Sequence, residues 1–288
     1  MQNLSEMMGK EFKKIRWDSK WSKEELAAVE GMTPMEEVCY WQNQKQGNLH
    51  TFDGIECSKC LNRGFINIVQ KLSNGVEVTA YQECECTIPR KSYKTAKESC
   101  MGDLLSYRLR DFKATEEFQV YMKEKAKQYI LEADKEWFLA LGQSGSGKTM
   151  ICASICNQRM TQYDKEREKF REVKYMIWNE FVDKIKRMNY DSDRDVYFDE
   201  FAKAEILYID DFLKGRYTET DLSYAYRLIN HRYNNNLTTI ITSEMFLNEL
   251  IDIDEAIGGR MKEKAGTYLV QIRRDRNRNY RLKDQEMI

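Results

Sequence analysis

The stretch Gly142-Gln143-Ser144-Gly145-Ser146-Gly147-Lys148-Thr149 follows an apolar run at residues 137–141 and fits the phosphate-binding loop pattern G-x-x-x-x-G-K-[ST]. Glycines permit a tight turn in which backbone N–H groups converge on an anion, and a helix beginning near Lys148 adds its positive end. Lys148 is expected to reach the β- and γ-phosphates of a nucleotide, and the Thr149 hydroxyl to ligate Mg²⁺. Strand, loop and helix in this order predict an α/β core with a parallel sheet.

A second apolar run, residues 206–209, ends in two adjacent carboxylates, Asp210 and Asp211. In phosphate-loop ATPases the first acid at this place holds Mg²⁺, and the second polarises the attacking water. We therefore expect Asp210 on the metal side and Asp211 as the catalytic base. The sequence contains no Asn-Lys-x-Asp motif for reading guanine, which favours ATP as the nucleotide.

Composition limits the class of protein. The 288 residues suffice for one or two domains, and the formal net charge of −1 gives no overall basic field. No apolar run approaches the roughly 18–20 residues that span a bilayer, and residues 1–20 are too charged for a signal peptide. We expect a cytoplasmic protein without a membrane partner, in which the eight cysteines are thiols or metal ligands.

Four of these cysteines are arranged as two pairs, Cys57-x-x-Cys60 and Cys84-x-Cys86, around two β-prone segments. Between the segments, residues 73–75 read Ser-Asn-Gly, which is typical of the turn in a tight hairpin. Closing that hairpin would bring the four thiols together. The spacing therefore predicts one tetrahedral Zn²⁺ site.

Other metal-ligand patterns are weaker. His50 is the imidazole near the cysteine pairs and remains an alternative to one sulfur. Cys152 and Cys156 are four residues apart on the helix expected after the phosphate loop, where small residues packing a core are favoured. Residues 191–195 resemble the start of a calcium loop, but the later positions lack the required Gly and Glu.

The chain is expected to contain an N-terminal helical and zinc-binding domain at residues 1–100, a charged linker at 101–115, and an ATPase domain at 116–288. Apolar residues at helical spacing support the first helix: Leu4, Met7, Met8, Phe12 and Ile15. After residue 115, strand-like and helix-like segments alternate, which predicts helices on both faces of a parallel sheet.

At this level the sequence resembles the AAA+ ATPases, and more narrowly the DnaC/DnaI-type loaders of replicative helicases in their bacteriophage form. Most of the ATPase part carries the resemblance: residues 110–112, 137–149, 209–215, 239–244, 254–260 and 279–282. The resemblance implies a lidless AAA+ core that hydrolyses ATP and assembles into an ATP-dependent oligomer. It further implies that the N-terminal domain docks on a hexameric helicase and that the ATPase part binds single-stranded DNA.

The resemblance also implies roles for residues outside the phosphate loop. Arg260 corresponds to the finger contributed in trans to a neighbour's ATP, because its charged, planar fork suits developing phosphoryl charge. At the end of the fourth strand, where many relatives have Asn, Thr242-Ser243-Glu244 stands here. Ser243 is assigned as the catalytic sensor, with Glu244 as the alternative.

No room remains after Lys264 for a helical lid, so any lid-type arginine contact must come from the basic tail at residues 273–281, Arg281 included. The same arginines are candidate contacts for the phosphate backbone of single-stranded DNA. Two rival functions stay open: an IstB-type transposition helper, and a DNA-binding adaptor that uses ATP only as a conformational latch.

Overall fold

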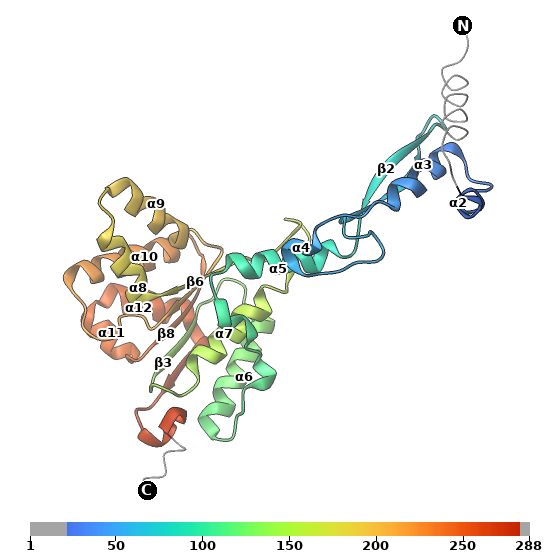
Figure 1. The fold of residues 1–288 in the computed structure, drawn as a ribbon. Coiled ribbons are helices and arrows are strands. Elements are labelled where there is room, and N and C mark those ends of the chain that lie inside the picture. Colours follow the sequence, from blue (N-terminus) through green and yellow to red (C-terminus); the bar gives the residue numbers. More distant parts are fainter. Residues whose placement is uncertain (1–21, 283–288) are drawn as a thin grey trace. The chain divides into compact units, whose positions relative to one another are not determined.

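The computed structural model describes residues 22–282, and the chain divides into two compact units, Met1–Lys91 and Ser92–Ile288 (Figure 1). The helical run expected at residues 4–15 lies outside the described residues. Among residues 22–282, no helix is long and apolar enough to cross a membrane.

The first unit begins with three short helices, α2 (Lys23–Ala28), α3 (Pro34–Asn43) and α4 (His50–Asp53). A capping box starts α3: the Thr33 hydroxyl accepts from the Glu36 N–H at 3.3 Å, and the Glu36 carboxylate accepts from the Thr33 N–H at 2.7 Å. Helical segments were expected here, and the helices are shorter than the periodicity suggested.

The predicted hairpin is confirmed. Strands β1 (Phe65–Lys71) and β2 (Glu77–Glu83) pair antiparallel, with Lys71 opposite Glu77. The Leu72 N–H donates to the Val76 carbonyl at 2.9 Å, which leaves three residues in the loop. Gly75 is the left-handed member, with φ 83°, so the loop is one residue longer than a two-residue turn.

Helix α3 packs on this hairpin through the Asn43 side chain. Asn43 Nδ2 donates to the Asn67 carbonyl at 2.9 Å, and Asn43 Oδ1 accepts from the Asn67 N–H at 2.8 Å. The Arg63 guanidinium donates to the same Oδ1 at 2.7 Å. One amide therefore ties α3 to β1 and to the segment before it.

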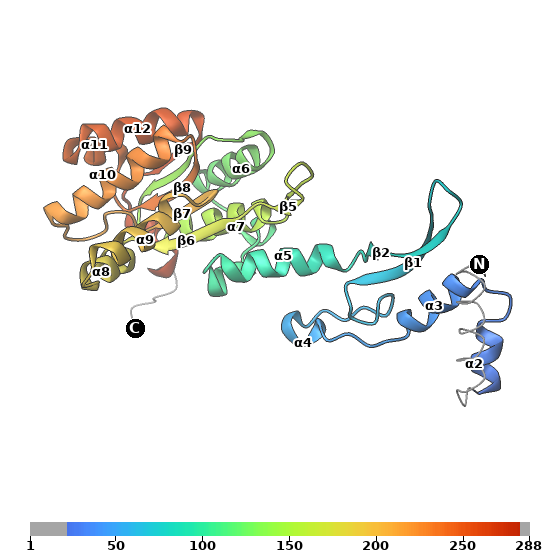
Figure 2. The same cartoon turned by 90° about the horizontal axis from the view of Figure 1, so that it is seen from above.

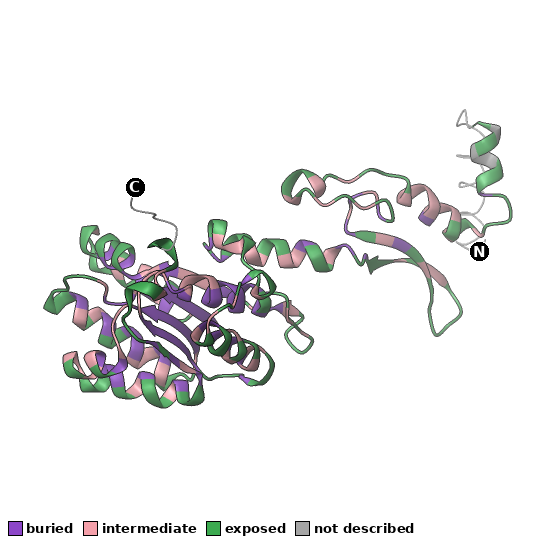
Figure 3. Cartoon of the chain, turned by 90° about the horizontal axis from the view of Figure 1, so that it is seen from below, coloured by how far each residue is buried: buried purple, intermediate pink, exposed green. Residues whose placement is uncertain are grey.

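The second unit is built on a parallel five-stranded sheet of order β6-β7-β8-β3-β9. Its strands are β3 (Phe138–Gly142), β6 (Val173–Ile177), β7 (Ile206–Asp210), β8 (Thr238–Ser243) and β9 (Leu269–Ile272). All residues of β3, β7 and β8 are buried, as expected for strands covered on both faces. Figure 3 shows this buried sheet between exposed helix surfaces.

Alternate strand residues belong to two separate cores. Phe138 and Ala140 pack with α6 (Glu117–Glu132) and α7 (Lys148–Arg159) on one face. Leu139 and Leu141 pack with the helices of the opposite face (Figure 2). Those helices are α8 (Trp178–Arg187), α9 (Asp191–Ala202), α10 (Glu219–Asn234), α11 (Leu247–Ile253) and α12 (Glu255–Ala265). The predicted three-layer α/β fold is confirmed.

Two local features differ from expectation. A single helix was expected from Glu180, whereas the structure has α8 and α9, and it has a small antiparallel hairpin, β4 (Tyr163–Asp164) with β5 (Lys169–Phe170). Helix α9 ends where the fully buried Arg232 donates to the carbonyls of Phe201, Ala202 and Ala204 at 3.2, 3.1 and 2.9 Å. That guanidinium satisfies the orphan carbonyls of the helix end.

The linker expected at residues 101–115 is instead folded. Helix α5 (Thr87–Glu98) is followed by two 3₁₀ helices, η1 (Gly102–Ser106) and η2 (Leu109–Asp111). Met101 and Phe112 are buried in the core beside α7, and Asn157 Nδ2 donates to the carbonyls of Leu104 and Tyr107, each at 2.8 Å. The segment carries many charged side chains, but its apolar residues pack inward. The second unit therefore begins at Ser92, before the expected linker.

After β9 the described chain holds only two 3₁₀ helices, η4 (Arg276–Arg278) and η5 (Tyr280–Leu282). The core is therefore lidless over the described residues, as expected.

Candidate nucleotide-binding site and cysteine cluster

The phosphate-binding loop predicted from the sequence connects β3 to α7 at the carboxyl end of the sheet. Gly142 and Gly147 have left-handed φ values of 96° and 95°. A Cβ on Gly142 would lie 2.2 Å from the Ile272 carbonyl oxygen, and one on Gly147 would lie 2.6 Å from the Phe112 ring. Both positions therefore require glycine for conformation and for space.

Lys148 is the first residue of α7, and its side chain folds back over the loop. Its Nζ donates to the carbonyls of Gly142 and Gln143 at 2.9 and 2.6 Å. Burial lowers the pKa of Lys148, while the nearby carboxylates of Glu244 and Asp211 act in the opposite direction. The ammonium is thus held where the free N–H groups of α7 also point, which is the arrangement that binds phosphate.

Asp210 lies at the end of β7 and is buried, with 7% of its surface exposed. Its Oδ1 accepts from the Thr149 hydroxyl at 3.3 Å and from the Thr242 hydroxyl, and its Oδ2 accepts from the Tyr175 hydroxyl at 3.2 Å. Asp210 and Thr149, the two expected Mg²⁺ ligands, are therefore adjacent. Oxygen ligands of this kind suit Mg²⁺ in nucleotide sites.

Asp211 is half-buried and has a left-handed backbone, with φ 54°. Its Oδ2 pairs with Lys214 Nζ at 3.0 Å, and the same Nζ pairs with Glu244 Oε1 at 3.0 Å. Burial would raise the pKa of Glu244, but hydrogen bonds from Lys214 and from Ser144 of the loop hold it below its ordinary value. One ammonium thus joins the expected catalytic base to an acid that touches the phosphate loop.

The structure places the residues after β8 differently from the sensor assignment. Ser243 is fully buried, and its hydroxyl donates to the Phe212 carbonyl at 2.7 Å. Glu244 instead contacts Ser144, and Thr242 contacts Asp210 and accepts from the Asp211 N–H at 3.0 Å. The geometry therefore favours Glu244, the alternative, over Ser243. Neither Thr242 nor Lys214 was assigned a role from the sequence.

A pocket of 290 Å³ opens beside the loop. Its lining includes Gly145 and Gly147 of the loop, Phe112 and Gln119 on the N-terminal side, and Tyr280 of the tail. The pocket thus combines the Phe112 ring, the Gln119 amide and the Tyr280 phenol with the glycines of the loop. Such a concave, mostly apolar site is of the kind that binds a planar base.

Arg260 lies on α12, away from these contacts. Its guanidinium donates to the Ala256 carbonyl at 3.0 Å and lies over the rings of Tyr226 and Tyr233, 5.5 and 5.6 Å from their centroids. Both tyrosines belong to α10. The trans role of Arg260 stays a prediction.

The basic tail is not uniformly solvated. Arg274 forms a bidentate pair with Glu249, at 2.8 and 2.7 Å, and Arg278 lies over the Phe118 ring at 5.2 Å. Arg273 and Arg276 are exposed and form no ion pair with the described residues. The DNA contacts of the tail arginines stay a prediction.

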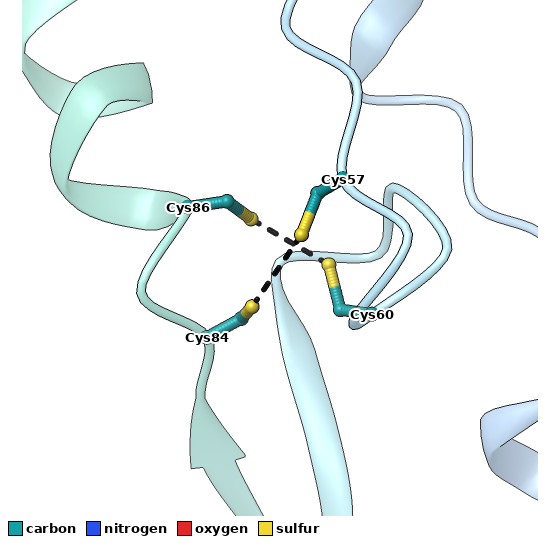
Figure 4. Close-up of side chains that lie close together, drawn as sticks. All are labelled: Cys57, Cys60, Cys84 and Cys86. Carbon is teal, nitrogen blue, oxygen red and sulfur yellow. Dashed lines mark hydrogen bonds between the residues drawn. The ribbon is translucent and has the colours of Figure 1, made fainter.

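The four predicted zinc ligands come together in the first unit. Cys57 and Cys60 precede β1, Cys84 and Cys86 follow β2, and the four side chains point toward one another (Figure 4). The ligand atoms all lie within 4.8 Å of one another, with Sγ–Sγ distances of 3.8 Å for Cys57–Cys84 and 3.5 Å for Cys60–Cys86. A Zn–S bond of about 2.3 Å in a tetrahedron requires sulfurs roughly 3.8 Å apart, so the donor set fits Zn²⁺.

The surroundings of the sulfurs favour a thiolate at Cys60, while burial raises the pKa of Cys84 and of Cys86. The Gly64 N–H donates to Cys60 Sγ at 3.3 Å. Burial would raise the pKa of Cys60, but this N–H and the neighbouring thiols hold it at about 6. His50 is outside the group of potential ligands found among the described residues, so the alternative with an imidazole is not supported. Cys152 and Cys156 are buried in the core of the second unit, as expected.

Residues 116–267, more than half of the chain, match the family described as the bacterial DnaA ATPase domain. The chain belongs to this family. The match covers the phosphate loop, Asp210, Asp211 and Arg260. It confirms the predicted ATPase activity, while the roles of the single residues stay predictions.

Two relatives come from Bacillus subtilis strain 168. The uncharacterized protein YqaM is 34% identical over 152 residues, which cover 51% of this chain and 46% of YqaM. The phage-like element PBSX protein XkdC is 28% identical over 243 residues, covering 76% of this chain and 82% of XkdC. The chain therefore spans about half the length of the first relative and most of the second.

Solved structures with a similar core include DnaI, at 21% identity and a TM-score of 0.46, with 59% of this chain and 92% of that chain covered. The DnaC helicase loader matches at 15% identity and a TM-score of 0.47, with 60% and 99% covered. The replication initiator DnaA bound to AMPPCP and single-stranded DNA matches at 20% identity and a TM-score of 0.46, with 59% and 50% covered.

Proposed function

We propose that this protein uses ATP to load a hexameric replicative helicase onto single-stranded DNA. The observation that carries the proposal is a combination within one chain: an ATPase domain of the bacterial DnaA family, and a separate N-terminal unit with a four-cysteine site. The sequence motifs that resemble DnaC/DnaI-type loaders are distributed over the same ATPase domain.

The geometry of the ATPase site supports a separate role for each of its residues. The loop 142–149 and Lys148 would bind the phosphates, and Thr149 with Asp210 would hold Mg²⁺, which neutralises phosphate charge when bound. Asp211 would orient the attacking water after its ion pair with Lys214 opens. Glu244 would act as the sensor residue through its contact with Ser144 of the loop. Arg260 of a neighbouring copy would complete the site, so hydrolysis would report assembly.

The N-terminal unit supports a docking role. Cys57, Cys60, Cys84 and Cys86 would hold one Zn²⁺, which crosslinks the two ends of the hairpin and stabilises a unit too small for a large core of its own. We assign this unit as the part of the protein that binds the helicase.

A loading assay tests the proposal. Purified full-length protein, the host's replicative helicase hexamer and circular single-stranded DNA are combined with ATP, and the helicase retained on the DNA is measured. Retention should rise with the wild-type protein and stay at the helicase-alone level with Lys148→Ala, which lacks the phosphate-binding ammonium. Equal retention with and without the wild-type protein contradicts helicase loading.

The two rival functions give other results. A transposition helper would stimulate a transposase and leave helicase retention unchanged. A conformational latch would bind DNA in the presence of ATP, yet its phosphate release would not change when single-stranded DNA is added. Phosphate release that rises with DNA, together with helicase retention, separates the loader from both.

A further inference from the structure

The segment after β9 runs back over the phosphate-binding loop, and its first residues are held by several contacts. Besides its bidentate pair with Glu249, the Arg274 guanidinium lies over the Phe246 ring, 4.8 Å from the centroid. The Ile272 carbonyl accepts from the Gln143 N–H at 3.0 Å. The segment is therefore fixed beside the first residues of the loop.

From this root the segment makes successive contacts along the loop. The Asp275 N–H donates to Gln143 Oε1 at 2.8 Å. Five residues later, the Tyr280 N–H donates to the Gly145 carbonyl at 2.9 Å. The Asn279 side chain fills the space over Gly145, where an added Cβ would lie 1.9 Å from Asn279 Oδ1. We call residues 275–282 the tail strap.

The tail strap also forms a wall of the pocket beside the loop. Tyr280 lines this pocket together with Phe112 and Met150, residues of the second unit's core. Arg278 lies over the ring of Phe118 on α6, outside this pocket, and so connects the strap to α6. The strap thus runs from β9 across the loop to α6.

We propose that Asn279 and Tyr280 are positioning residues for the nucleotide: the tail strap fixes the loop through Gly145 and closes the pocket over the bound base. The inference rests on the proposed ATP-binding function of the loop. Loop N–H groups bind phosphate only when the peptide planes around them are oriented. The bond from the Tyr280 N–H to Gly145 fixes one of those planes, and the Tyr280 ring shields the base side from water. Release of nucleotide requires both contacts to open.

The two contacts of Tyr280 can be separated by mutation. Tyr280→Ala removes the ring and keeps the backbone donor. Tyr280→Pro removes the ring and also the N–H, and the extended backbone of Asn279, with φ −87° and ψ 98°, is compatible with a following proline. Asn277→Ala, at an exposed residue of the same strap, is the matched control.

Dissociation of a fluorescent ATP analogue from the full-length protein is the measurement, with KM and kcat for ATP determined alongside. Tyr280→Ala should release the analogue several-fold faster, and Tyr280→Pro should add about a three- to tenfold increase, the effect of one net hydrogen bond. KM should rise with kcat nearly unchanged, because the strap contacts no reacting atom. Asn277→Ala should behave as wild type.

Equal dissociation rates for wild type and both Tyr280 variants overturn the tail strap while leaving nucleotide binding intact. Slower dissociation in the variants overturns it as well, because it would make the strap an obstacle to the nucleotide. If the wild-type protein bound no ATP analogue, the proposed ATPase function itself would be contradicted. Melting temperatures of the nucleotide-free variants, expected to equal that of wild type, exclude general unfolding as the cause of faster release.

Discussion

Asp210 and Asp211 are neighbours in sequence but have different surroundings. Asp210 is buried and accepts three hydroxyl hydrogen bonds, from Thr149, Thr242 and Tyr175. Asp211 is half-exposed, and its Oδ2 forms an ion pair with the Lys214 ammonium at 3.0 Å. The first carboxylate is held as a fixed ligand, and the second can exchange its partner for a water molecule.

Asp211→Asn should therefore keep nucleotide binding and lose about 10²–10⁴-fold in hydrolysis, the usual contribution of a general base. Asparagine has the same shape and tolerates the left-handed backbone of this position, so the loop should not change. Phosphate release and ATP-analogue binding are measured in parallel. Asp183→Asn, an exposed carboxylate on α8, serves as the control. Undiminished phosphate release from Asp211→Asn contradicts its role as the base.

The sequence could identify these acids because a short apolar strand and its end are local features. It could not decide between Ser243 and Glu244. That choice depends on which side chain at the end of β8 points toward Phe212 and which toward Ser144. Such orientation follows from packing between strands and loops that are far apart in the chain, and no spacing rule records it.

At the scale of single elements, the β1–β2 hairpin brings the two cysteine pairs together. Its ends are held by further contacts beside the sulfurs. Arg90 is buried and donates to both carboxylate oxygens of Asp53, at 2.5 and 2.6 Å, and to the Ile55 carbonyl at 2.6 Å. The pKa of Arg90 reflects burial, which lowers it, opposed by hydrogen bonds to Cys86 and Asp53, with the net direction upward. A permanent cation beside Cys86 favours a thiolate cluster with net negative charge.

We expect about one Zn²⁺ per chain, retained through purification and removed only by strong chelation or unfolding. The double variant Cys57→Ser/Cys60→Ser should lack this ion, because a hydroxyl is a far poorer zinc ligand than a thiolate. Its first unit should be more sensitive to protease, while ATP binding by the second unit should persist. Metal analysis of both proteins is the measurement, and Cys39→Ser, a buried cysteine outside the cluster, is the control. Wild-type protein that is free of zinc after gentle purification contradicts the assignment.

Elements with a strong local signal were predictable, and those decided by tertiary packing were not. The hairpin, and the two strands expected at residues 137–141 and 206–209, lie within a few residues of the predicted bounds. The segment at residues 101–115 was read as a linker because its charges are conspicuous. Its Leu104, Leu105 and Leu109 pack against a core that forms only when α6 and α7 are in place. The end of α9 likewise depends on Arg232, which lies about thirty residues beyond it in the chain.

At the scale of the whole molecule, the second unit brings together the residues expected to bind the phosphates and Mg²⁺ of a nucleotide. Within the described residues, the ammonium groups of Lys148 and Lys214 are both engaged by their own unit. Arg260 of α12 lies over the rings of Tyr226 and Tyr233 of α10. Its contacts are therefore with α10 and not with the phosphate-binding loop. A guanidinium in this place suits a role toward a second copy of the chain, which is the arrangement expected in an oligomeric ATPase.

Mixing two inactive variants tests that role. Arg260→Ala should bind ATP normally and lose about 10³-fold or more in hydrolysis, because developing phosphoryl charge loses its arginine. Lys148→Ala should lose nucleotide binding but keep Arg260. Mixed together, the intact loop of the first variant can meet the intact Arg260 of the second, so part of the phosphate release should return.

The control distinguishes this from a structural role in packing α12 on α10. Lys262→Ala, an exposed residue of the same helix, should hydrolyse ATP as wild type does. If Arg260 only stabilised α12 through its tyrosine contacts, Arg260→Ala would show a lowered melting temperature and no recovery at any mixing ratio. A bell-shaped curve of phosphate release against mixing ratio, highest when the two variants are both abundant, requires active sites shared between two chains, because neither variant can build a complete site from its own residues.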